Sequence, residues 1–301
     1  MSRTTSEIAS QPDCWRAAAQ LAADKDTQAA LPPEGLEVAV VGCGTSFFMA
    51  RAYAALREAS GGGRTDAFPA SEYPVARDYP FVLAICRSGT TTEVVRLLER
   101  LPAGSDSLVI TAVAGTPAPA AARRALVLDF ADEESVVQTR FATTTLALLR
   151  ASLGVDVGRL ADDAERALAA PLPLTPGAVE QVSFLGEGWT FGLAEEAALK
   201  LREAAQFWAE SYLAMEYRHG PISIAAPGRA VWAFSALPSG LADQIGATGA
   251  TLVHSGDLDP MAALVLAQRF AVETAGARGL DPDRPRALTR SVILSDRGET
   301  P

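Results

Sequence analysis

The stretch Val38-Ala39-Val40-Val41-Gly42-Cys43-Gly44-Thr45-Ser46 decides the fold. Its four consecutive apolar residues, ended by a glycine, are typical of a strand buried on both faces of a parallel sheet. A segment with helical spacing follows over 46–59 and ends at a run of three glycines. Phe81–Ile85 repeats the apolar run, and a second helix is predicted over 91–100. Strands that alternate with helices predict an α/β fold whose parallel sheets are covered by helices on both faces.

The length of the chain and a proline-rich break within it predict two domains. At 301 residues the chain exceeds the usual size of one domain. A proline-rich stretch at 171–176 predicts a linker, after which the alternation restarts with a strand at 182–186 and a helix over 190–212. Further strands are predicted at 108–113, 125–128, 230–234 and 251–254, and further helices at 138–152, 240–248 and 260–275. We expect an N-terminal helix within residues 1–30, a first domain at 31–170 and a second at 177–301.

The amino-acid composition limits the classes of binding partner that we expect for this protein. Twenty-six Lys and Arg against 36 Asp and Glu give a net charge of -10, which disfavours nucleic acid and anionic membranes. The polar N-terminus predicts no secretory signal, and no apolar run approaches the ~20 residues of a membrane span. We therefore expect a cytoplasmic protein. Three cysteines without CxxC spacing and only two histidines argue against a disulfide framework or a metal centre, and no cofactor is expected.

Two loops have the composition of an anion site. Each lies between a buried strand and a helix, where glycines expose backbone N–H groups and the helix start favours negative charge. Ordinary helix capping is the alternative: Thr90 and Glu93 fit a capping box, and Ser46 could cap its helix. Because two such loops follow neighbouring strands, we favour phosphate binding over helix capping as their role. The candidate ligands are Gly44, Thr45, Ser46, Arg87, Ser88, Gly89, Thr90 and Thr91.

A predicted helix carries a possible catalytic group. Glu196, Lys200 and Glu203 fall at i, i+4 and i+7, which is one helix face. A surface ladder of salt bridges has the same spacing. The helix follows a glycine-rich strand end at 186–188, where ligands bind in open α/β sheets, and the rare His219 follows it. This placement favours a functional site.

These motifs resemble a known family. Gly42–Ser46, Ser88–Thr90, Ala198–Glu203 and His219–Pro221 are similar in order and spacing to the isomerase half of glucosamine-6-phosphate synthase. They are also similar to the amino-sugar-phosphate isomerase/deaminase proteins of the double-SIS (sugar isomerase) family. The resemblance covers about residues 36–294, and the glutaminase domain of the synthase has no counterpart in this sequence.

The resemblance implies a fold and a set of roles. It implies two flavodoxin-like SIS domains with a site between them that is completed across a homodimer, and a hexosamine 6-phosphate as substrate. By position, Glu203 would move the C2 proton, Lys200 would lie near C1 and C2, and His219 of a second copy would open the sugar ring. The phosphate would be held by Thr45, Ser46, Ser88 and Thr91, and the pocket would include Val136, Gln138, Thr139, Glu196 and Glu210.

Departures from the family pattern bear on the chemistry. The first serine and the glutamine of the synthase's Ser-Gln-Ser-Gly loop correspond to Cys86 and Arg87, and Arg87 is expected to add a charge-assisted bond to phosphate. The lysine that forms an imine in the synthase corresponds to Arg290, which stays protonated and cannot form a Schiff base. We therefore expect no glucosamine synthesis by the family mechanism.

The predicted reaction begins with ring opening and removal of the C2 proton by Glu203. With a free 2-amine, reprotonation at C1 leads to isomerisation or deamination. With a 2-acetamido group, loss of the 3-hydroxyl would make the protein a dehydratase. A phosphoketose-amine deglycase shares the fold and is not excluded. A non-catalytic sugar-phosphate sensor is disfavoured because Glu203 and His219 are both present.

Overall fold

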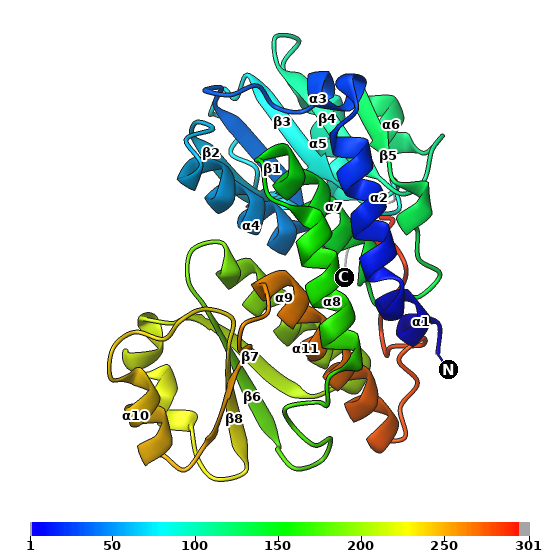
Figure 1. Cartoon of the computed structure of the whole chain (residues 1–301). Helices are drawn as coiled ribbons and strands as arrows, with labels where there is room; N and C mark the ends of the chain where they lie inside the picture. The colour runs from blue at the N-terminus through cyan, green and yellow to red at the C-terminus, as the bar shows by residue number, and fades with distance from the viewer. Residues whose placement is uncertain (1, 295–301) are drawn as a thin grey trace, which may run out of the picture.

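Two parallel sheets organise the chain, and the computed structural model describes them within residues 2–294 (Figure 1). The first has the order β2-β1-β3-β4-β5 and the second β7-β6-β8-β9. All neighbouring strands pair in parallel. The strands are β1 (Val38–Gly42), β2 (Thr65–Pro69), β3 (Phe81–Ile85), β4 (Asp106–Thr111), β5 (Arg124–Val127), β6 (Gln181–Gly186), β7 (Trp208–Leu213), β8 (Arg229–Ala233) and β9 (Thr251–His254). The predicted α/β class is confirmed.

Helices connect and cover these strands. The α-helices are α1 (Arg3–Ala9), α2 (Gln11–Ala22), α3 (Lys25–Ala30), α4 (Thr45–Ala59), α5 (Thr92–Arg100), α6 (Pro117–Ala121), α7 (Arg140–Ser152), α8 (Val157–Ala169), α9 (Thr190–Ala205), α10 (Leu241–Ala247) and α11 (Pro260–Ala277). Short 3-10 helices are η1 (Ala70–Glu72), η2 (Asp129–Ala131), η3 (Glu216–Arg218) and η4 (Pro221–Ile224). Among residues 2–294, no helix has the length and hydropathy that a membrane span requires.

The two sheets share a layer of helices between them, seen at the centre of Figure 1. One hydrophobic core runs through this layer and includes Val40 of β1, Leu146 of α7, Leu193 of α9 and Phe184 of β6. Where α4 and α9 meet, a Cβ on Gly192 would lie 2.4 Å from the Phe48 carbonyl oxygen and 3.1 Å from the Ala52 Cβ. Small residues therefore let the two helices approach closely, which brings the start of α4 next to the side chains of α9.

The sequence-based prediction of helices was wrong in two places. The helix predicted over 190–212 ends at Ala205, and the edge strand β7 follows at once. Gln206 makes the break, because its left-handed backbone (φ 50°) cannot continue a right-handed helix. The N-terminal helix predicted within residues 1–30 is divided into α1, α2 and α3.

Replacing Gly192 by Ala should destabilise the protein by about 2 kcal/mol, because the added methyl group has no space against the α4 backbone. Gly246→Ala in α10 is the matched control, since no atom lies within 4 Å of the position of its Cβ. That change should be neutral or stabilise by up to about 1 kcal/mol. Urea unfolding measures both, and equal effects would contradict the close approach of α4 and α9.

Candidate functional site

Lys200 lies at the centre of a buried polar cluster. Its Nζ is 2.5 Å from Glu203 Oε2, 3.1 Å from Thr45 Oγ1 and 3.4 Å from Glu196 Oε1. The two carboxylates lie one turn before and one turn after Lys200 on α9, so the predicted common face is confirmed. Thr45 begins α4, so the cluster joins the first predicted phosphate loop to the α9 face.

Burial sets the charges of this cluster. It raises the pKa of the Glu196 carboxyl to about 7, an effect that the neighbouring Lys200 only partly offsets. Burial also opposes the charge on Lys200, but the two glutamates outweigh it and raise the pKa of the ammonium group. Lys200 is therefore a fixed cation, and Glu196 can exchange a proton near neutral pH. The Glu203 side chain is the one acid of the pair that reaches solvent, with 18% of its surface exposed.

A pocket of about 410 Å³ opens onto Glu203. Its volume lies within the range of small-molecule sites. The second half of α9 and the segment after α11 form its walls, which comprise Leu199, Arg202, Glu203, Gln206, Phe207, Arg286 and Leu288. A sugar-sized molecule in this pocket would lie beside the Glu203 carboxylate.

The hydroxyl loops do not cap their helices. The N-cap of α4 is Gly44, and the N-cap of α5 is Thr91, whose side chain makes no capping bond. The capping alternative for Ser46 and for Thr90 with Glu93 is therefore wrong. In the second loop, a Cβ on Gly89 would lie 1.9 Å from Thr116 Oγ1, so only glycine fits there. The Ser88, Thr90 and Thr91 hydroxyls gather instead around Ser291, in the segment after α11.

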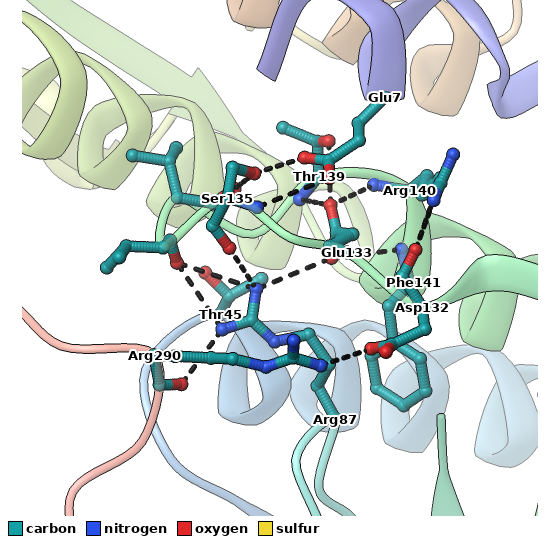
Figure 2. A network of polar contacts seen from close by, with 12 residues as sticks. Glu7, Thr45, Arg87, Asp132, Glu133, Ser135, Thr139, Arg140, Phe141 and Arg290 are labelled. Carbon is teal, nitrogen blue, oxygen red and sulfur yellow. Dashed lines mark hydrogen bonds and ion pairs between the residues drawn. The ribbon is translucent and has the colours of Figure 1, made fainter. Parts of the chain in front are cut away.

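Arg87 holds loops together (Figure 2). Its buried guanidinium donates to the Ser135 carbonyl at 3.0 Å and the Arg290 carbonyl at 2.8 Å, and lies 3.7 Å from the Glu133 carboxylate. Burial lowers the pKa of Arg87, while Glu133 opposes that change. Of the three guanidinium nitrogens of Arg87, Nε has no hydrogen-bond partner among residues 2–294. The expected phosphate contact of Arg87 is therefore replaced by contacts to neighbouring backbone.

Two buried glutamates complete this network and were missed from the sequence. Glu133 accepts from the Thr139 amide at 2.5 Å and the Arg140 amide at 2.9 Å, and burial raises its pKa against the effect of Arg87. Glu7 of α1 accepts from the Glu134 amide at 2.7 Å and from the Ser135 amide at 3.2 Å. The first helix thereby fixes the loop that carries the predicted pocket wall. Hydrophobic periodicity gives no signal for charged residues used in this way.

The remaining predicted site residues lie on the loop at 132–139, in the segment after α11 and at the edge of the second sheet. Val136 and Gln138 lie on the loop that Arg87 and Glu7 fix, and Gln138 Oε1 is a buried acceptor without a partner among the described residues. The Arg290 side chain pairs with Asp132. The exposed His219 makes no side-chain hydrogen bond or ion pair within residues 2–294, and the structure does not bring it to the Lys200 cluster.

Glu210 also lies apart from Lys200. It belongs to β7 and accepts a hydrogen bond from Trp208 Nε1 at 3.0 Å. Gln181 Nε2 donates to its other carboxylate oxygen at 3.4 Å.

Known proteins share both the sequence pattern and the fold. The glutamine-fructose-6-phosphate aminotransferase of Methanothermobacter thermautotrophicus is 26% identical over 305 residues, which cover 85% of this chain. The chain spans about half the length of such curated relatives, 51% in this case. Glucosamine-6-phosphate deaminase from Thermotoga maritima superimposes with a TM-score of 0.83 at 24% identity, covering 97% of this chain and 100% of that one.

Tagatose-6-phosphate ketose/aldose isomerase from Escherichia coli gives a TM-score of 0.78 at 20% identity, over 99% and 97% of the two chains. No protein-family model matches the chain. The chain is therefore similar to SIS-domain proteins in sequence and in fold. The predicted resemblance to SIS-domain proteins is confirmed. In this chain, α4 and α9 contact each other in the helical layer between the two sheets.

The free energy of unfolding of the protein should depend on pH through Glu196. Its folded-state pKa of about 7 exceeds the ordinary 4.5, so the folded state binds more protons between these values. The contribution of Glu196 to stability is therefore lost as pH rises through that window. Glu196→Gln removes this titrating group. The free energy of unfolding of the variant should therefore vary less with pH between 4.5 and about 7 than that of the wild type. Urea titrations at several pH values test this, and parallel curves for the two proteins would contradict it.

Arg87→Met should lower the free energy of unfolding by about 3 kcal/mol, because it leaves the Glu133 carboxylate buried without its cation. The double variant Arg87→Met/Glu133→Gln removes that charge as well and should recover part of the loss. Chemical denaturation of the wild type, both single variants and the double variant measures the coupling. Strict additivity would show that the pair does not interact.

Proposed function

We propose that this protein is a sugar-phosphate isomerase-type enzyme, and that Glu203 moves the C2 proton of a hexosamine 6-phosphate. The observation that carries the proposal is the Lys200 cluster, in which an ammonium group lies 2.5 Å from Glu203 beside a pocket of about 410 Å³. The relatives' names support the substrate class, since they act on fructose, glucosamine and tagatose 6-phosphates.

The two hydroxyl loops are the proposed phosphate site. Thr45 and Ser46 begin α4, and Ser88 and Thr91 precede α5, so both helix starts present N–H groups and hydroxyls. The absence of side-chain capping bonds supports this assignment, because these hydroxyls are not used by their own helices. Arg87 would act indirectly, by fixing the loop through the carbonyls of Ser135 and Arg290.

The charges of the cluster suit proton abstraction beside a carbonyl. The Lys200 ammonium group donates to Glu203 Oε2 at 2.5 Å and so holds the carboxylate in one direction. When Glu203 takes the C2 proton, the electron pair moves to C1 and negative charge develops on the C1 oxygen. Lys200 is the cation placed to stabilise this oxyanion. Return of the proton to C1, with transfer of a proton from the C2 amine to the C1 oxygen, gives a C2 imine. Addition of water to this imine releases ammonia and leaves the ketose phosphate.

A second copy of the chain is proposed to supply His219 for ring opening. His219 is exposed, as are the apolar side chains of Trp208, Leu213 and Met215 around the same edge of the second sheet. Such exposed apolar residues beside an edge strand are typical of a surface covered by another chain. A homodimer would place the histidine of each copy at the other's site.

Proton NMR in D2O tests the function. Purified protein is incubated with glucosamine 6-phosphate and, separately, with N-acetylglucosamine 6-phosphate. Glu203→Gln should reduce exchange or turnover at least ~100-fold, as expected for loss of a general base. Glu195→Gln is the matched control, because this glutamate lies on the same helix but pairs with Arg51 at 2.8 Å. It should retain activity.

Each outcome has a distinct meaning. Ammonia and a ketose phosphate would identify an isomerase/deaminase, and a vinylic signal with loss of water would identify a dehydratase. Equal loss in both variants would remove Glu203 from its proposed role. Binding of both sugars without any reaction would instead identify a non-catalytic sugar-phosphate sensor.

A further inference from the structure

The segment after α11 occupies the loop to which the proposed function assigns the phosphate. Ser291 Oγ lies 3.1 Å from Ser88 Oγ, 2.9 Å from Thr90 Oγ1 and 3.4 Å from Thr91 Oγ1. One hydroxyl of the chain therefore lies within hydrogen-bond distance of three hydroxyls that an anion would use. Ser291 is separated from these three residues by 200 to 203 positions in the sequence.

The backbone of the same segment occupies the start of α5. The Thr92 amide, the first of this nine-residue helix, donates to the Val292 carbonyl at 3.1 Å. The Leu294 amide donates to Thr92 Oγ1 at 2.9 Å. Unpaired N–H groups at a helix start are the groups that bind anions. Here a carbonyl oxygen of the chain already accepts from one of them.

Two arginines hold the segment in this position. Arg87 donates to the Arg290 carbonyl at 2.8 Å, and the Arg290 side chain pairs with Asp132. Arg87 is itself buried and bound to the Ser135 carbonyl, so its guanidinium is a rigid support. The docked position of residues 290–294 therefore depends on a buried network and not on surface contacts alone.

We propose that residues 290–294 compete with the substrate's phosphoryl group for one site. The segment and the phosphate would bind the same hydroxyls and the same helix start, so one must leave before the other binds. This inference rests on the proposed function, which takes the loop as the phosphate site. The substrate can displace the segment because bonds from these donors to a phosphate dianion are charge-assisted and stronger than bonds to a serine hydroxyl. Docking lowers the apparent affinity by the fraction of chains in which the segment is bound.

Calorimetric titration of the full chain with inorganic phosphate and with glucosamine 6-phosphate tests the competition. Ser291→Ala should bind both about fivefold more tightly, because it removes only neutral hydrogen bonds of the competitor. Thr91→Val should bind both about tenfold more weakly, because it removes a hydroxyl of the site itself. Ser60→Ala is the control: this hydroxyl donates to the Arg57 carbonyl at the end of α4, and its removal should change neither affinity.

The sign of the Ser291 effect decides between competitor and ligand. Weaker binding by Ser291→Ala would show that Ser291 holds the phosphate and would overturn the proposal. An unchanged affinity with weaker binding by Thr91→Val would also overturn it, while leaving the phosphate loop in place. If neither variant differs from the wild type, the loop does not bind phosphate, and that part of the proposed function fails too.

Amide hydrogen exchange gives a second measurement. Saturating phosphate should speed exchange in the peptide that contains the Leu294 amide, since that amide loses its bond to Thr92 Oγ1. Slower exchange would mean that the segment closes more tightly over a bound anion, which would also overturn the proposal.

Discussion

The buried ammonium group of Lys200 is the constraint on which the site depends. A lone cation in this position would be costly, and the ion pairs to Glu196 and Glu203 make it tenable. The same arrangement fixes the direction of the Glu203 carboxylate and raises the pKa of Glu196 to about 7 through burial. Helical spacing alone sets this geometry within α9. The contact to Thr45 then ties it to another part of the chain.

That contact requires the two halves to approach closely. Gly192 and the facing Ala52 permit the approach, so the site can form only when the core is packed in this way. A second set of contacts, around Arg87, Glu133 and Glu7, fixes the loop at 132–139 and the segment after α11. Buried charge thus positions the backbone on two sides of the predicted phosphate loop, while the hydroxyls within the loop stay available to exchange partners.

The central strands and the shared helix face of the Lys200 cluster could be predicted from local sequence patterns. Continuous apolar runs located β1 and β3, and the i, i+4, i+7 spacing located the Lys200 face. The edge strands were harder: β2 contains Asp66 and Pro69, which disguise a strand, and β7 follows a good helix without a proline or glycine. Arg87 was assigned to phosphate because the Glu133 carboxylate and the carbonyls that bind it come from elsewhere in the chain. Contacts between residues so far apart in the sequence cannot be predicted from the spacing of neighbouring residues.

A crystal structure of the Glu203→Gln variant with a hexosamine 6-phosphate tests the account most directly. The account predicts the phosphate within hydrogen-bond distance of the Ser88 and Thr91 hydroxyls, with C2 of the sugar about 3–3.5 Å from the side chain at position 203. Ser291 would be displaced from the loop in that complex. A sugar phosphate bound with its phosphate away from the loop, or with C2 remote from position 203, would contradict the account.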